Sequence, residues 1–402
     1  MDNQDLAAFG AVAARVAGEC EDVVPASNAV ELAWPELAQA FHIQTERLDS
    51  LPSGLKPGVP TRVEVIDSAV THRGDGEPGR GCLAHGRAMG LIVRDLACPA
   101  SGASCRASVA STLALPLVAK ADGTLQRDTE NGGFFGTTLD LARAVEDAVS
   151  AWRSDASHQP LVISLSLGWA SKHGGEYVQD AGDLPASIRP VWEAIAKARC
   201  YGAAVIAPTG NRGEGPNDGQ GPLFPSAWAA NTVPSLQTCR DLGVSEIAAH
   251  YDPNGPLVFA VGGLEANDAD LGIGRTQARP RLVAPAAHAV VPDGAGHSAL
   301  QTGTSVATAV ASAAFAIVWS YRPGLSAEDV FDIVYAGGAD IGRPVQLCAA
   351  GECEAQTAHR VSICGAVRKA CSEGAGLCPA KMPACAQLPG GRVARPNLKS
   401  LP

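Results

Sequence analysis

The sequence is poor in aromatic residues and in positive charge. Phe, Trp and Tyr make up only 5% of its 402 residues, so we expect a core of closely packed helices and strands with small side chains. Lys and Arg number 31 against 41 Asp and Glu, which gives a formal net charge of −10. A nucleic-acid-binding protein needs a basic face to neutralise phosphates, so we predict no nucleic-acid partner.

The sequence also lacks a hydrophobic run long enough to cross a membrane. Residues 298–321 carry no charge, but the first half of this stretch is polar and contains glycine. Only residues 306–319 are continuously helix-like and mostly apolar, whereas a membrane span needs about 20 such residues. We therefore predict a buried core helix there and no membrane span. Hydrophobic residues make up 46% of the chain, which excludes global disorder.

The twelve cysteines include no Cys-x-x-Cys pair, the spacing typical of zinc sites. Half of them lie in one short segment near the C-terminus, namely Cys348, Cys353, Cys364, Cys371, Cys378 and Cys385. We favour disulfides over metal for this Cys-rich tail, and disulfides point to an oxidising compartment. The first residues, MDNQD, are acidic where a signal peptide is basic. We expect a secreted or periplasmic protein whose signal peptide is not present in this sequence, with a cytoplasmic protein as the alternative.

Composition and patterning divide the chain into three parts and show no tandem repeat. We predict an N-terminal extension at residues 1–57, a domain at residues 58–345 and a Cys-rich C-terminal tail at residues 346–402. In the domain, short apolar strands alternate with helices. The expected strands are residues 62–67, 161–168 and 203–207, and the expected helices are residues 84–97, 138–152, 191–199 and 306–319.

Helices of this length between apolar strands imply right-handed crossovers. The predicted fold class is therefore α/β, with a mostly parallel sheet covered by helices on both faces. In the helix at residues 138–152 we expect Leu139 and Leu141 to share the apolar face with the alanines and valines that follow.

Four polar residues lie at junctions between these strands and helices. Asp67 ends a strand, His85 begins a helix, Asn211 follows a strand and Ser305 begins the apolar helix. Each has an ordinary structural explanation, such as a turn, a core histidine or an N-cap. Together, Asp, His and Ser form the set that nucleophilic acyl transfer requires. A helix N-terminus at Ser305 and the amide of Asn211 would supply two donors to a developing oxyanion.

Five segments carry a resemblance to a known family. They are VEVIDS at residues 63–68, HG at 85–86, ISLSLG at 163–168, APTGNRG at 207–213 and GTSVAT at 303–308. In this order, over residues 58–345, they resemble the subtilisin-like serine proteases, the subtilase family. The segment around Ser305 is the most specific of the five, because GTSxAT followed by a helix of small apolar residues is rare by chance.

The resemblance implies a serine endopeptidase that acts on polypeptide substrates. Ser305 would be the nucleophile, His85 the general base and Asp67 the carboxylate that orients it. Asn211 would form the oxyanion hole with the N–H of Ser305. Two further segments would bind an extended substrate and wall the pocket for the residue before the scissile bond: Ser166, Leu167 and Gly168, and Ala207, Pro208 and Thr209.

We expect a monomer that needs no cofactor for its chemistry, we identify no metal ligands, and we leave structural calcium open. Residues 231–256 look like an insertion relative to the family, and Arg87 and Ala309 depart from its usual residues. Two alternatives stay open. One is a catalytically inactive subtilisin-like scaffold that binds extended peptides, and the other is a cytosolic processing protease for one partner peptide.

Overall fold

The computed structural model describes residues 58–378, apart from internal gaps, together with the short strand β1 (Ala11–Ala13). The gaps are residues 69–84, 99–104, 116–117, 120–124, 127–134, 158, 172–173, 175–180, 213–218, 266–267, 279, 288, 293–297, 350–351 and 374–377. The predicted N-terminal extension at residues 1–57 therefore lies outside the described residues, except for β1.

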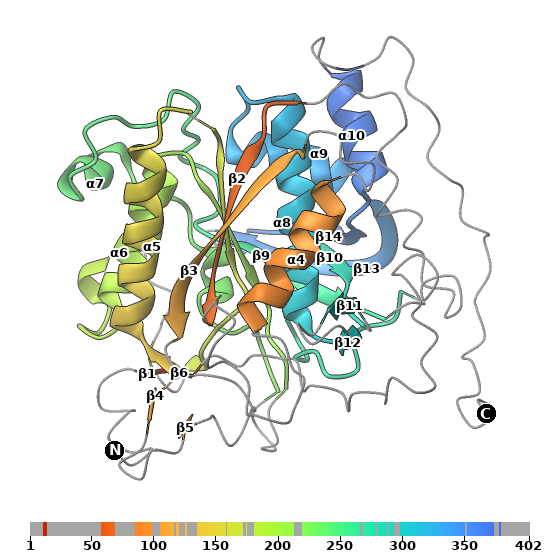
Figure 1. The fold of residues 1–402 in the computed structure, drawn as a ribbon, viewed down its shortest axis with the longest axis horizontal. Coiled ribbons are helices and arrows are strands. Elements are labelled where there is room, and N and C mark those ends of the chain that lie inside the picture. The colour runs from red at the N-terminus through yellow and green to blue at the C-terminus, as the bar shows by residue number, and fades with distance from the viewer. Residues whose placement is uncertain are drawn as a thin grey trace.

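An eight-stranded sheet runs through the middle of the domain (Figure 1). Its strands, in spatial order, are β13 (Ala339–Ala349), β14 (Glu352–Arg360), β10 (Leu282–Pro285), β9 (Phe259–Leu264), β8 (Ala204–Pro208), β7 (Leu161–Leu165), β2 (Thr61–Ser68) and β3 (Ala107–Leu115). All neighbours pair in parallel except β13 and β14, which form an antiparallel hairpin. The predicted mostly parallel sheet is confirmed.

Helices cover both faces of the sheet (Figure 1). One face carries α5 (Thr138–Arg153) and α6 (Arg189–Cys200), and the other carries α4 (His85–Ala97) and α8 (Thr304–Tyr321). Behind α8 lie α9 (Ala327–Gly337) and α10 (Ile363–Ser372). Short pieces complete the fold, namely α7 (Leu236–Asp241) and the strand pairs β1 with β6 (Phe135–Thr137), β4 (Val118–Ala119) with β5 (Leu125–Gln126), and β11 (Ala289–Pro292) with β12 (Ser298–Gln301).

Each face of the sheet has its own apolar core, because the side chains of a strand point alternately to the two faces. In β7, Val162 packs with the α4 and α8 side, whereas Leu161 and Ile163 pack with the α5 and α6 side. In β8, Ile206 packs on the α4 and α8 side, and Val205 packs on the α5 and α6 side. This two-sided burial explains why β7 and β8 are almost continuous apolar runs rather than alternating apolar and polar residues.

The helix α8 lies at the centre of the larger core, and all of its residues are buried. It is long and apolar enough to span a membrane by length and composition, but it is enclosed by protein along its whole length. The predicted core helix at residues 306–319 is confirmed, and the observed helix is two residues longer at each end. Its alanines and serines allow it to lie close to both the sheet and α4.

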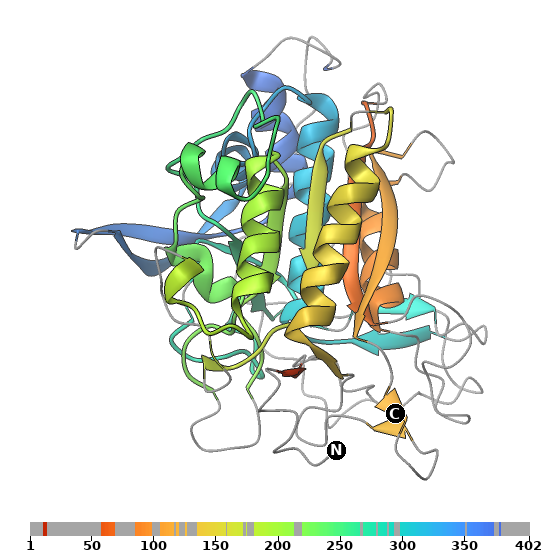
Figure 2. The ribbon, with the colours of Figure 1, turned by 90° about the vertical axis from the view of Figure 1, so that its left-hand side faces the viewer.

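The sheet continues beyond residue 345, where we predicted that the domain ends. β13 runs across this position, and β14 pairs in parallel with β10. The next helix, α10, buries Ile363 and Val367 in the same core as α8. Figure 2 shows the β13–β14 hairpin reaching outward from the rest of the sheet. The density of cysteines after residue 345 suggests a stapled tail, but much of this segment is part of the α/β layer structure.

One residue of the apolar face that we predicted for α5 is exposed in the structure. Leu139 is 47% exposed and does not lie on the buried face of α5, because it is two residues from Leu141 and projects to the opposite side of the helix.

The insertion at residues 231–256 contains α7, and a disulfide between Cys200 and Cys239 links it to the end of α6. Cys98 with Cys105 and Cys371 with Cys378 form further disulfides, and Cys364 is also disulfide-bonded.

An ion pair between Arg199 and Glu328 lies beneath this insertion and joins α6 to α9. The side chain of Arg199 is only 2% exposed, and it also donates to the carbonyl oxygens of Ala203 and Pro256. Burial lowers the pKa of Arg199 and raises the pKa of Glu328, while the attraction between the two charges opposes both shifts. The cation therefore depends on Glu328 for its neutralisation.

We predict that Glu328→Ala lowers the free energy of unfolding by about 3–5 kcal/mol, because it leaves a buried cation without its carboxylate. The matched control is Glu146→Ala, which breaks the partly exposed ion pair with Lys197 and should cost about 1 kcal/mol or less. Urea denaturation of both variants measures the difference. Equal small losses would mean that the carbonyl groups of Ala203 and Pro256 suffice to hold Arg199.

Candidate functional site

Asp67 and His85 are in direct contact. Asp67 is near the carboxyl end of strand β2, and His85 is the first residue of α4. The Nδ1 atom of His85 lies 2.9 Å and 3.0 Å from the two carboxylate oxygens of Asp67. Both side chains are buried, at 0% and 6% exposure. A carboxylate in this position accepts a hydrogen bond from Nδ1–H, which fixes the ring orientation and leaves a lone pair on Nε2.

The other ring nitrogen of His85 is buried and makes no hydrogen bond within the part of the chain that the structure describes. Buried polar atoms in folded proteins are nearly always hydrogen-bonded, so an exception needs an explanation. A basic nitrogen held in place by a carboxylate and lacking a protein donor is suited to accept a proton from a group that arrives later or turns toward it.

Ser305 is the second residue of α8, where the backbone N–H groups have no acceptor within the helix. Its Oγ lies 3.5 Å from the carbonyl oxygen of Ser166, and the Oγ of Ser166 in turn donates to the carbonyl oxygen of Ser305 at 3.3 Å. These contacts tie the N-terminus of α8 to the end of β7. The helix dipole there favours negative charge.

Asn211 lies just after β8 and is 6% exposed. Its Oδ1 accepts hydrogen bonds from the backbone N–H of Thr304 at 3.1 Å and from the Oγ1 of Thr304 at 2.9 Å. The N-cap residue of α8, Gly303, has no side chain, so Asn211 supplies the capping oxygen from another part of the chain. Because a backbone N–H needs an acceptor, the amide orientation is fixed, and Nδ2 is the group left to donate.

The structure thus brings the four predicted residues together in two pairs: Asp67 contacts His85, and Asn211 lies beside Ser305 through Thr304. Nε2 of His85 makes no hydrogen bond to Ser305 or to any other described residue. The helices α4 and α8 pack against each other on the same face of the sheet. All four side chains come from the ends of parallel strands or from the helices next to them, which is where α/β proteins collect their binding groups.

The predicted substrate-binding residues form two short backbone segments. Residues 166–168 follow β7, and Ala207 and Pro208 end β8 with Thr209 directly after them. All six are buried. The side chain of Leu167 packs in the core with α5 and α6, so only the backbone of this residue is available to a ligand.

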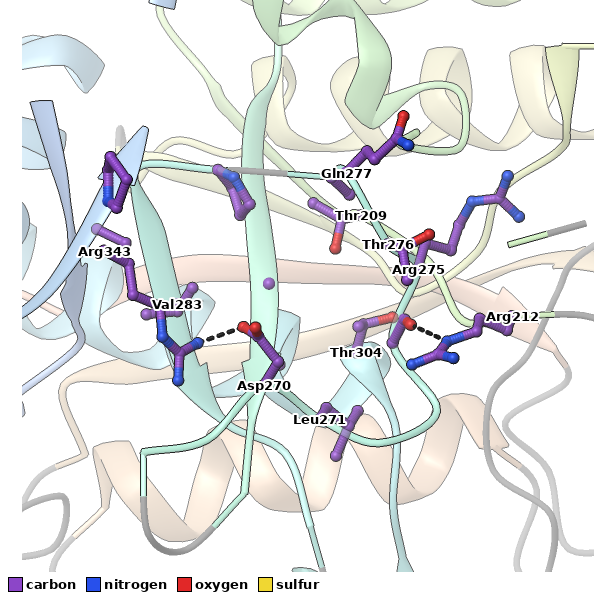
Figure 3. A pocket seen from close by; sticks show the side chains of 17 residues that line it. Thr209, Arg212, Asp270, Leu271, Arg275, Thr276, Gln277, Val283, Thr304 and Arg343 are labelled. Carbon is purple, nitrogen blue, oxygen red and sulfur yellow. Dashed lines mark hydrogen bonds and ion pairs between the residues drawn. The ribbon is translucent and has the colours of Figure 1, made fainter. Parts of the chain in front are cut away.

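A cavity of about 360 Å³ lies beside Thr209 and Thr304. Its charged lining residues have partners, since Arg343 pairs with Asp270 and Arg212 donates to the carbonyl oxygen of Gly274 at 2.7 Å (Figure 3). Within the described residues there is no group of three or more His, Cys, Asp or Glu side chains that could hold a metal ion.

Sequence reasoning missed two residues that shape this region. Thr304 positions Asn211, and its place next to Ser305 at a helix start was the available signal. Leu223 lies close to both substrate-binding segments, with its backbone N–H bonded to Thr209 and its side chain against Gly168. Its neighbours in the sequence gave no indication of this.

Comparison with known proteins finds one family whose sequence model matches the chain and several solved structures with a similar fold. The sequence model of the subtilase family matches residues 125–336, slightly more than half of the chain. This range includes Asn211 and Ser305 but neither Asp67 nor His85. No curated protein matches the chain.

The solved structures that are similar to this one include the following three. A mutant of the protease domain of PatA has a TM-score of 0.49 at 19% identity, covering 80% of this chain and 99% of that one. MycP1, a serine protease described as an essential component of the type VII (ESX-1) secretion system, has a TM-score of 0.49 at 18% identity, covering 89% and 95%. The subtilase cytotoxin SubAB has a TM-score of 0.47 at 17% identity, covering 84% and 96%.

The contact between Asp67 and His85 predicts the position of the ring proton. In the neutral ring we expect the proton on Nδ1, because the carboxylate can only accept. In Asp67→Asn the new amide can donate to Nδ1, so we expect a population with the proton on Nε2 instead. Multiple-bond ¹⁵N NMR of the imidazole at a pH where it is neutral distinguishes the two forms. Identical spectra of the two proteins would contradict the contact.

Proposed function

Because the chain belongs to the subtilase family, we propose that it is a serine endopeptidase that cleaves peptide bonds through an acyl-enzyme on Ser305. The observation that carries this proposal is the buried His85, held by Asp67 at Nδ1 and without a hydrogen bond at Nε2 among the described residues. Asn211 and the N-terminus of α8 add donors beside Ser305.

In the proposed reaction, the Oγ of Ser305 attacks the carbonyl carbon of the scissile bond while Nε2 of His85 takes its proton. For this step the hydroxyl must turn from the carbonyl oxygen of Ser166, to which it now points, toward the imidazole. Hydrogen bonds of this kind are often long before substrate binds and shorten in the complex. Asp67 stabilises the resulting imidazolium and keeps its orientation.

The tetrahedral intermediate carries negative charge on the former carbonyl oxygen. Nδ2 of Asn211 and the backbone N–H of Ser305 would donate to this oxygen, and the helix dipole adds to their effect. Collapse of the intermediate breaks the C–N bond, and the imidazolium gives its proton to the leaving amine. Water then attacks the acyl-enzyme, with His85 again as the base, and releases the acid product and free Ser305.

The substrate would lie extended along residues 166–168, pairing backbone to backbone, a mode that needs few side-chain contacts. The buried side chain of Leu167 agrees with backbone recognition here. None of these steps uses a cofactor. The contact of Ser305 with Ser166 rather than His85 is the one observation that favours the alternative, an inactive scaffold that binds extended peptides.

A fluorophosphonate probe separates the two functions. We predict covalent labelling of Ser305 in the wild-type protein and loss of labelling in Ser305→Ala and His85→Ala, with the fold checked by circular dichroism. A folded wild-type protein that stays unlabelled but binds peptides would establish the scaffold.

For the oxyanion hole, we predict that Asn211→Ala lowers kcat with little change in KM. The reason is that Nδ2 would donate a hydrogen bond to the substrate oxygen only once that oxygen carries negative charge. The expected loss is roughly 10²–10³-fold, the magnitude measured when the oxyanion-hole asparagine of subtilisin itself is removed. Because Asn211 also caps α8, the melting temperature must be measured beside the kinetics. A loss of activity that only follows a loss of folded protein would assign Asn211 a structural role alone.

Disulfides are typical of proteins in oxidising compartments, and three are present among the described cysteines with both partners assigned. This supports a secreted or periplasmic protease over a cytosolic processing enzyme. We predict that thiol titration of the natively purified protein, denatured without reductant, finds few or no free thiols. Twelve free thiols would overturn the assignment.

A further inference from the structure

The two predicted substrate-binding segments are joined by a third piece of chain. The backbone N–H of Leu223 donates to the carbonyl oxygen of Thr209 at 2.9 Å. The next residue, Phe224, exchanges two backbone hydrogen bonds with Trp169, at 2.8 Å and 2.9 Å. Residues 223–224 therefore lie between the segment that follows β7 and the segment that follows β8, and they hold the two at a fixed separation.

The side chain of Leu223 fills the space between these segments. A Cβ built on Gly168 would lie 2.7 Å from the carbonyl oxygen of Phe224, and 3.1 Å from Cβ and 3.3 Å from Cδ1 of Leu223. A Cβ built on Gly210 would lie only 2.5 Å from its Cγ and Cδ1. Glycine at both positions thus makes room for one leucine side chain, and at Gly210 the φ angle of +98° also favours glycine.

Leu223 is 1% exposed, so little space between the two segments remains open around it. The cavity beside Thr209 and Thr304 is a separate space, because neither Gly168 nor Leu223 lines it (Figure 3). A large side chain entering between the segments would have to occupy the volume that the isobutyl group of Leu223 already fills, and well-packed sites tolerate such overpacking poorly.

We propose that Leu223 restricts the residue before the scissile bond to small side chains, namely glycine, alanine or serine. This inference rests on the proposed endopeptidase function and adds the substrate class to it. Leu223 is a specificity-determining residue that takes no part in the chemistry. Replacing it with a smaller residue opens the space between Gly168 and Gly210 to a larger substrate side chain.

The test uses two peptidyl phosphonates that differ only in the side chain next to phosphorus, methyl or benzyl, and a fluorophosphonate that has no such side chain. In the wild type we expect the methyl probe to label Ser305 at least about tenfold faster than the benzyl probe. In Leu223→Ala the ratio of the two rates should fall by at least about tenfold, because three carbon atoms are removed from the site.

Two controls separate specificity from stability. Leu223→Met conserves volume and should keep the wild-type ratio. Leu282→Ala removes the same atoms from a buried leucine of β10, in the core on the α8 side, and should also keep the ratio even if it destabilises the protein. If Leu223→Ala does not fold, Leu223→Val should shift the ratio in the same direction by a smaller factor.

The outcomes are distinguishable. If the fluorophosphonate labels Ser305 but the wild type accepts the benzyl probe as fast as the methyl probe, the inference about Leu223 is wrong and the endopeptidase stands. The same holds if Leu223→Ala leaves the ratio unchanged. If a folded wild type gives no label with the fluorophosphonate, the proposed function fails and this inference fails with it.

Discussion

The pair of hydrogen bonds from Thr304 to the Oδ1 atom of Asn211 holds together the two parts of the molecule on which the candidate site depends. One part is the end of β8, and the other is the start of α8. A helix start that is buried needs acceptors for its N–H groups, and the N-cap residue Gly303 has no side chain to supply one. The same contact that satisfies the helix therefore fixes the direction of the Asn211 amide, and folding and site geometry share one interaction.

The position of α8 imposes a second constraint, because a fully buried helix must be made of residues that fit against neighbours on every side. Its run of Ala, Ser and Val lets β7, β8, β9 and α4 approach closely, and this brings the ends of the strands near Ser305. Two apolar cores on opposite faces then keep the parallel strands in register. The site stands on rigid elements, which is what positioned chemistry requires.

Local sequence patterns were sufficient for the elements that carry the candidate site. β2, α4, β8 and α8 follow from apolar periodicity and from polar residues at their ends, and the places of Asp67, His85, Asn211 and Ser305 at these ends follow with them. Their chemical roles stay predictions. What the sequence could not reveal depends on long-range contacts. The pairing of β14 with β10 was hidden by a segment dense in cysteines, and the packing of Leu223 against Gly168 involves residues far apart in the chain.

The late position of β14 and α10 has a consequence for biosynthesis. The core around α8 is completed by Ile363, Ala366, Val367 and Ala370, which are synthesised some sixty residues after Ser305. A nascent chain that has already emerged past Ser305 still lacks the strand and the helix that enclose the far side of α8. The core that encloses α8, and with it the surroundings of the proposed nucleophile, is thus completed only after residues 352–372 have been added to the growing chain.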